Sequence, residues 1–228
     1  MPLLFVQVTH YRLFYPATIL MAWPWFGVVP LLVLAYYGIY LFSWQQREPR
    51  LKPWAFPAIA FAAAAFVLIS FLFVNAMTLM VEPDRWAKIW QATDVSGAVT
   101  GLGLNLTSPA LFPRWLMMFG LALCSVGAWL AIDTAFFAQS ESEAYRTEAR
   151  TLAVRLYAAG AAAAVVMGTV YIFGTLPAEV RGWLLSGWRL PLFLLTAAAP
   201  LVGFGAMVWQ SRRALPQSAW VLFAAHLL

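Results

Sequence analysis

Three polar side chains occur at helical spacing inside an otherwise apolar stretch. Asn75, Thr78 and Glu82 are three and four residues apart, so a helix places all three on one face. Met77 and Met117 fall at a similar predicted depth. A polar stripe beside thioethers is typical of a site that lines the edge of a quinone or a haem. The alternative is ordinary helix packing, in which methionine fills gaps.

Two opposite charges inside apolar stretches form a second candidate. Asp133 and Arg155 fall at similar depth if their helices form an antiparallel hairpin. A charged side chain at the centre of a membrane helix costs about 2.5–3.5 kcal/mol on insertion scales, so such charges tend to pair. We interpret Asp133 and Arg155 as a structural ion pair that fastens the hairpin. The alternative is that Asp133 relays protons.

Histidine and cysteine are scarce in this sequence. The two histidines, His10 and His226, lie outside the long apolar stretches, and Cys124 is the single cysteine. Membrane b-type haems are generally held by histidine pairs or by a histidine and a methionine. We therefore expect no b-type haem held by two histidines. We also expect no metal site, no disulfide and no CxxC redox motif.

Five long apolar stretches must position these side chains. Each has about 20 residues or more, the length a helix needs to cross a hydrocarbon core of roughly 30 Å. None shows the alternation typical of barrel strands, so helices are predicted. The fold class is therefore an all-α, polytopic membrane helix bundle forming one membrane domain over residues 1–228. The predicted spans are residues 19–42, 56–81, 115–137, 152–173 and 190–209.

The connections carry weaker signals. Residues 84–91 place Trp86 and Trp90 four apart with basic residues nearby, which predicts a short helix in the membrane interface. Residues 96–109 are rich in Gly, Asn, Thr and Ser, which predicts a coil. The last apolar segment, residues 219–228, is too short to span.

Composition and charge limit the function classes. The chain is 63% hydrophobic and 10% charged, whereas soluble domains have about 25% charged residues. Its net charge of +5 is scattered over loops, so a nucleic-acid partner is not expected. Eight Lys and Arg residues fall on one side of the predicted topology and six on the other. This bias predicts a multi-pass membrane protein with its N-terminus outside.

Two segments resemble the quinol-oxidising subunit I of cytochrome bd oxidases. In residues 22–37, Pro30 matches that family's first helix, and Trp25 stands where the family has a histidine. In residues 108–130, Arg114 matches a basic residue, and Met117 stands where a haem-binding histidine follows it by three positions. The resemblance implies a shortened relative that has lost its haem ligands. It also implies a place in the bacterial inner membrane. Together with the polar stripe at Asn75 and Glu82, it predicts that Asn75, Glu82, Arg114 and Met117 flank a quinone or a haem edge.

These observations favour a haem-poor accessory subunit of a bacterial multi-subunit respiratory complex. Such a subunit scaffolds other membrane subunits and cytochrome-type redox subunits, flanks a quinone site, and is not catalytic by itself. One alternative is a small redox protein with haem bound through Met117. Another is a small-molecule transporter, which requires a polar midplane site.

Overall fold

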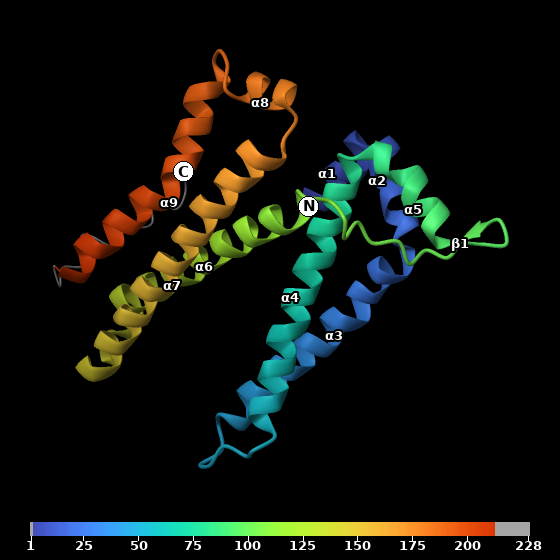
Figure 1. Ribbon diagram of the computed structural model, residues 1–228. Helices are drawn as coiled ribbons and strands as arrows, with labels where there is room; N and C mark the ends of the chain where they lie inside the picture. Colours follow the sequence, from blue (N-terminus) through green and yellow to red (C-terminus); the bar gives the residue numbers. More distant parts are fainter. Residues whose placement is uncertain (1, 213–228) are drawn as a thin grey trace. The chain divides into compact units, whose positions relative to one another are not determined.

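The computed structural model describes residues 2–212, and they fold mainly into helices (Figure 1). Five helices are long and apolar enough to cross a membrane. The predicted all-α, multi-pass fold is thereby confirmed, with ends that move by up to nine residues from the predicted spans. The apolar segment 219–228, with His226, lies outside the described residues. The five helices are α3 (Ala22–Gln45), α4 (Ala55–Met80), α6 (Leu111–Phe136), α7 (Glu143–Thr169) and α9 (Arg189–Arg212).

The chain divides into two compact units, with the boundary between Leu111 and Phe112. The first unit holds α3 and α4, and the second holds α7, α9 and nearly all of α6. The single membrane domain expected from the sequence stays a prediction, because each unit is defined by its own packing.

The first unit begins with two short helices, α1 (Pro2–Thr9) and α2 (Tyr11–Leu20). The helix breaks at Met21, whose φ is −114° and ψ is 39°, and α3 starts at Ala22. Pro24 falls in the first turn of α3, where backbone N–H groups have no helical partner, so it costs no hydrogen bond. Pro30 lies inside the helix and removes one.

Helices α3 and α4 pack as a hairpin through small residues (Figure 1). Ala35, Ala62 and Ala65 are buried at the crossing. A Cβ built on Gly38 would lie 2.7 Å from the carbonyl oxygen of Ala58. Backbone therefore lies against backbone here, the usual way in which membrane helices approach closely.

The connection after α4 forms a turn η1 (Pro83–Arg85), a helix α5 (Trp86–Thr93) and two short strands. The predicted short helix is present. Trp86 donates its indole N–H to the carbonyl of Leu79 at 2.9 Å, which ties α5 to the end of α4. Strands β1 (Asp94–Val95) and β2 (Ala98–Val99) pair around Ser96 and Gly97, both with positive φ, as tight hairpin turns require.

A coil then runs from Thr100 to Ala110. The coil predicted over residues 96–109 is therefore wrong at its start, where residues 96–99 form the turn and second strand of the hairpin. The observed coil binds the break between α2 and α3: Gly103 donates its N–H to the carbonyl of Leu20 at 2.9 Å, and Trp23 donates to Gly101 at 3.0 Å. Gly101 has a φ of 73°, and a Cβ on Gly103 would lie 2.8 Å from the Leu20 carbonyl oxygen. Both positions therefore need glycine.

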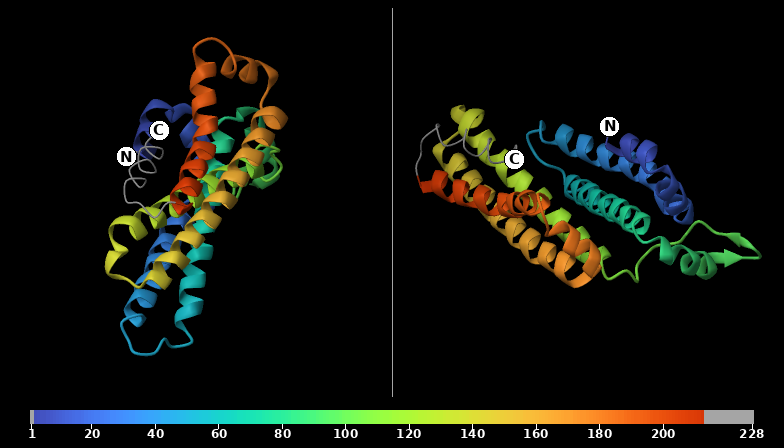
Figure 2. Two further views of the ribbon diagram at one scale, coloured as in Figure 1. Left: turned by 90° about the vertical axis from the view of Figure 1, so that its left-hand side faces the viewer. Right: turned by 90° about the horizontal axis from the view of Figure 1, so that it is seen from above.

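The second unit packs α6, α7 and α9 together (Figure 2). A Cβ on Gly160 of α7 would lie 2.5 Å from the carbonyl oxygen of Gly120 on α6, and one on Gly127 would lie 2.8 Å from that of Ala153. On the other side of α7, the buried ring of Tyr157 occupies the space that a side chain at Gly203 of α9 would need.

Two short connections complete the second unit. The turn after α6 contains η2 (Ala138–Ser140), and Ser142 caps α7 by accepting the N–H of Tyr145 at 3.2 Å. Helix α7 ends in a π-helical turn, η3 (Val170–Thr175), which the sequence did not reveal. Helix α8 (Ala178–Leu184) then leads into α9.

Candidate functional site

The polar face predicted on α4 is the centre of a buried network in the first unit. Glu82 follows the last turn of α4, and its carboxylate accepts hydrogen bonds from Asn105 Nδ2 and Ser108 Oγ, each at 2.8 Å. Arg85 Nε lies 3.0 Å from the same carboxylate. One cation and two neutral donors thus compensate the charge of Glu82, and they offset the free-energy cost of its partial burial.

About two turns earlier on α4, Asn75 joins the same network. Its Oδ1 accepts the backbone N–H of Asn105 at 3.1 Å. Thr78 is also buried, but its hydroxyl donates to the carbonyl of Val74 on its own helix at 2.7 Å. Only two of the three residues on the predicted face therefore reach out to the coil.

Two atoms of this network have no hydrogen-bond partner among the described residues. They are Nδ2 of Asn75 and Oδ1 of Asn105, and both side chains are buried. One is a donor and the other an acceptor. A buried amide without a partner is costly, so the native protein usually supplies a water or a ligand group.

Asn105 and Ser108 were missed at the sequence level. They lie in a coil that has no periodic pattern, so nothing in the sequence indicated which side chains turn inward. The available signal was indirect, since a carboxylate at a helix end needs donors, and the coil is rich in Asn and Ser.

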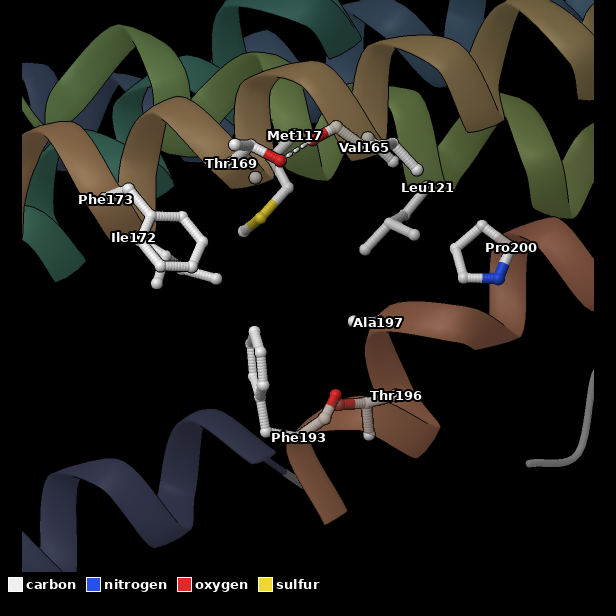
Figure 3. Close-up of a pocket in the computed structure, with 12 residues that line it drawn as sticks. Met117, Leu121, Val165, Thr169, Ile172, Phe173, Phe193, Thr196, Ala197 and Pro200 are labelled. Atoms are coloured by element: carbon white, nitrogen blue, oxygen red, sulfur yellow. Dashed lines mark hydrogen bonds between the residues drawn. The ribbon is translucent and has the colours of Figure 1, made fainter. Parts of the chain in front are cut away.

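The second unit contains an apolar cavity of about 270 Å³ among α6, α7, η3 and α9 (Figure 3). The side chains of Met117, Leu121, Phe173 and Phe193 point into it. The remaining lining residues come from the same elements: Ala164, Val165, Gly168, Thr169, Ile172, Thr196, Ala197 and Pro200.

The cavity offers hardly any polar group to a ligand. The Thr169 hydroxyl donates its proton to the carbonyl of Val165 at 2.7 Å (Figure 3). The Thr196 hydroxyl donates to the carbonyls of Leu192 and Phe193 at 3.1 and 2.9 Å. Each hydroxyl has a single proton, and both are used within their own helices. The site therefore suits hydrocarbon.

The four residues predicted to flank one ligand belong to two sites. Asn75 and Glu82 lie in the polar network of the first unit, and Met117 lines the cavity of the second. Arg114, one turn before Met117, places its guanidinium 5.9 Å from the centre of the Tyr171 ring. The prediction that they flank a quinone or haem edge remains a prediction.

Asp133 and Arg155 lie on α6 and α7, as expected. Asp133 is half-buried and Arg155 is exposed. A direct ion pair between them is not among those formed by residues 2–212, which join Glu82 to Arg85 and Glu143 to Arg146 and Arg150. Close glycine contacts hold α6 against α7 instead, and a stabilising role of the two charges stays a prediction.

Within the described part of the chain, no group of three or more His, Cys, Asp or Glu side chains has the arrangement of a metal site. His10 lies beside α2 with its Nδ1 2.7 Å from the hydroxyl of Thr9. Comparison with known proteins adds no further assignment, because no family model, curated protein or solved structure matches this chain.

Proposed function

We propose that this chain is an accessory membrane subunit of a bacterial multi-subunit respiratory complex. The observation that carries the proposal is how little of each span the chain itself buries. In the most apolar window of the span, 17% of the residues of α3 are buried, and 11% of those of α9. Helices so little covered by their own chain are suited to packing against other helices or lipid.

Two glycines with open space beside them favour packing against helices of partner subunits. No other part of the described chain comes within 4 Å of a Cβ built on Gly27 of α3 or Gly205 of α9. Small residues on an uncovered face let another helix approach closely in a membrane.

The electron-transfer role follows from the resemblance of the segments around Pro30 and Arg114 to the quinol-oxidising subunit. Since Trp25 and Met117 stand at the histidine positions, the chain itself carries no b-type haem in this proposal. It works beside cytochrome-type redox subunits in the inner membrane, with its N-terminus outside, and is not catalytic alone.

A quinone ring beside Asn75 is a second candidate role, and one observation favours it. The Asn75 amide has a buried donor without a partner, within one network with the Glu82 carboxylate. An amide N–H binds a quinone carbonyl, and a carboxylate accepts a quinol proton. In this role the subunit flanks a quinone site.

Purification in mild detergent from the native host tests the assembly. We expect the 25.3 kDa chain to migrate in a larger complex with stoichiometric partners. Gly27→Leu and Gly205→Leu should each reduce partner recovery at least fivefold. Gly182→Leu is the matched control, because Gly182 is equally open but lies on α8 outside the spans. A monomer that supports normal respiration would overturn the proposal.

Binding of a short-chain quinone to the purified protein tests the second role. Asn75→Leu should weaken binding at least tenfold, about 1.4 kcal/mol. Thr78→Val is the control, because Thr78 lies on the same face but donates only to its own helix. Equal affinity in both variants would remove the quinone role and leave the assembly role intact.

The orientation is tested by cysteine labelling after Cys124→Ala. Ser96 at the tip of the strand hairpin and Ser140 after α6 are both exposed, so either accepts a cysteine. We expect Ser96→Cys to react with an impermeant reagent added outside, and Ser140→Cys to react only after the membrane is opened. The reverse pattern would place the N-terminus inside.

A further inference from the structure

Three arginines lie near residues that line the apolar cavity of the second unit, two of them by position on a helix and one by a hydrogen bond. Arg114 precedes Met117 by three residues on α6, and Arg189 precedes Phe193 by four on α9. Arg181 of α8 donates a guanidinium N–H to the carbonyl of Phe173 at 3.1 Å. The cavity therefore has a basic end.

Arg189 is held in a fixed orientation. Its Nε donates to the carbonyl of Trp183 at 2.7 Å, and one terminal nitrogen donates to the Ser186 hydroxyl at 3.1 Å. The guanidinium carbon lies 4.2 Å from the centre of the Trp183 ring and 5.9 Å from that of Trp188. A guanidinium has five N–H donors, so donors remain beyond these two bonds.

The charge at this end is complementary to an anion. Residues 177–189 contain two arginines and one acidic residue, Glu179. Arg114 adds a third positive charge. The indoles of Trp183 and Trp188 are largely exposed, as is typical of tryptophans at the level of lipid headgroups. An oriented arginine at that level suits a phosphate, which it binds through parallel N–H groups.

Beyond the arginines, the cavity runs along the candidate membrane spans. On α9 its lining runs from Phe193 to Pro200, which is about 10 Å at 1.5 Å per residue. Its volume of about 270 Å³ exceeds the roughly 150 Å³ of an apolar cavity that binds benzene. Since Thr169 and Thr196 donate within their own helices, the space accepts a hydrocarbon chain without polar atoms.

We propose that this cavity and its three arginines form a site for one anionic phospholipid. The phosphate binds at Arg181 and Arg189, Arg114 adds positive charge one turn before the lining residue Met117, and the upper part of one acyl chain fills the cavity. Both parts are needed: the arginines select the negative headgroup, and the cavity selects a molecule with a hydrocarbon chain over a soluble anion.

Native mass spectrometry of the delipidated full chain tests the site, with phosphatidylglycerol and phosphatidylcholine of identical acyl chains as probes. We expect phosphatidylglycerol to bind at least tenfold more tightly than phosphatidylcholine. Arg189→Gln and Arg181→Gln should each reduce this preference at least threefold. Arg47→Gln is the matched control, because it removes one exposed charge from the loop between α3 and α4 and should leave the preference unchanged.

A second variant tests the cavity. Ala197 lines it and is exposed, so Ala197→Phe fills the space and should weaken phosphatidylglycerol binding at least fivefold, with helicity and thermal stability unchanged. Glycerol phosphate, which lacks acyl chains, should not displace the lipid at equal concentration. Equal binding of the two lipids, an Ala197→Phe variant with full affinity, or displacement by glycerol phosphate would each overturn the proposal.

Discussion

The end of α4 and the cavity of the second unit show opposite ways of finishing membrane helices. At the end of α4, the chain returns through a coil and fills the space with its own Asn105 and Ser108, which bind Glu82. In the second unit, α6, α7, η3 and α9 leave an apolar space of about 270 Å³. The first arrangement is completed by protein, and the second is left open to another molecule.

The comparison also shows what the two units share. Each crosses its helices through glycine against backbone, at Gly38 in the first and at Gly120 and Gly160 in the second. The crossings therefore provide the close packing, and the helix ends provide the difference in chemistry. Four experiments test this division.

The largest effect is expected at a helix crossing. Gly160→Val places a Cβ 2.5 Å from the Gly120 carbonyl oxygen and 2.8 Å from the Cys124 nitrogen, and backbone atoms cannot move aside. We expect a loss of more than 3 kcal/mol, the upper range of overpacking, measured by unfolding in mixed detergent micelles. Gly205→Val, at an open position of α9, should lose less than about 1 kcal/mol. Equal losses would show that the crossing is not close-packed.

Removal of Glu82 should have the next largest effect. Glu82→Ala leaves the buried Asn105 and Ser108 without their acceptor, and each unpaired polar group costs about 1–3 kcal/mol when buried. We expect a loss of roughly 3 kcal/mol and faster proteolysis between Thr100 and Ala110. Asp84→Ala, an exposed acidic residue two positions on, is the control. An unchanged proteolysis rate for Glu82→Ala would mean that the coil is held by its backbone contacts alone.

A larger side chain should destabilise the coil after α4 but not the cavity of the second unit. Gly103→Ala brings a Cβ within 2.8 Å of the Leu20 carbonyl oxygen, and we expect a loss of about 1–2 kcal/mol from overpacking. Ala197→Leu adds more atoms but extends into the cavity, and should change stability by less than about 0.5 kcal/mol. Thermal unfolding of both variants checks this, and a larger loss for Ala197→Leu would contradict the idea of an open space.

The smallest effect is expected for the charges on α6 and α7. Asp133→Leu combined with Arg155→Leu should be tolerated better than Asp133→Leu alone, by about 0.5 kcal/mol at most. The single change leaves the Arg155 charge alone in an apolar segment, but the two side chains are not in direct contact, and even exposed charge pairs that are contribute only roughly 0.2–1 kcal/mol. A double-mutant cycle on detergent unfolding measures the coupling. If the double variant assembles normally but stops proton-coupled turnover, Asp133 is a proton-relay residue instead.

The spans could be predicted because length and apolarity are local properties of the sequence. The shared face of Asn75 and Glu82 followed from helical spacing in the same way. Their partners could not be found, since the direction of Asn105 depends on how a coil without periodicity closes on α4. The cavity was equally hidden, because an empty volume depends on how three helices cross, and the π-helical turn at Val170–Thr175 has no sequence pattern of its own.

The separation of 23 residues between Glu82 and Asn105 has a consequence for synthesis at the ribosome. At about 5–20 residues per second, Asn105 follows Glu82 by roughly 1–5 s. During that interval the carboxylate at the end of α4 has Arg85 as its nearest partner in sequence. All residues of the first hairpin and of the coil that binds Glu82 are then translated before most of α6. The hydrogen bonds of Asn105 and Ser108 to Glu82 can therefore form while the chain is still being synthesised.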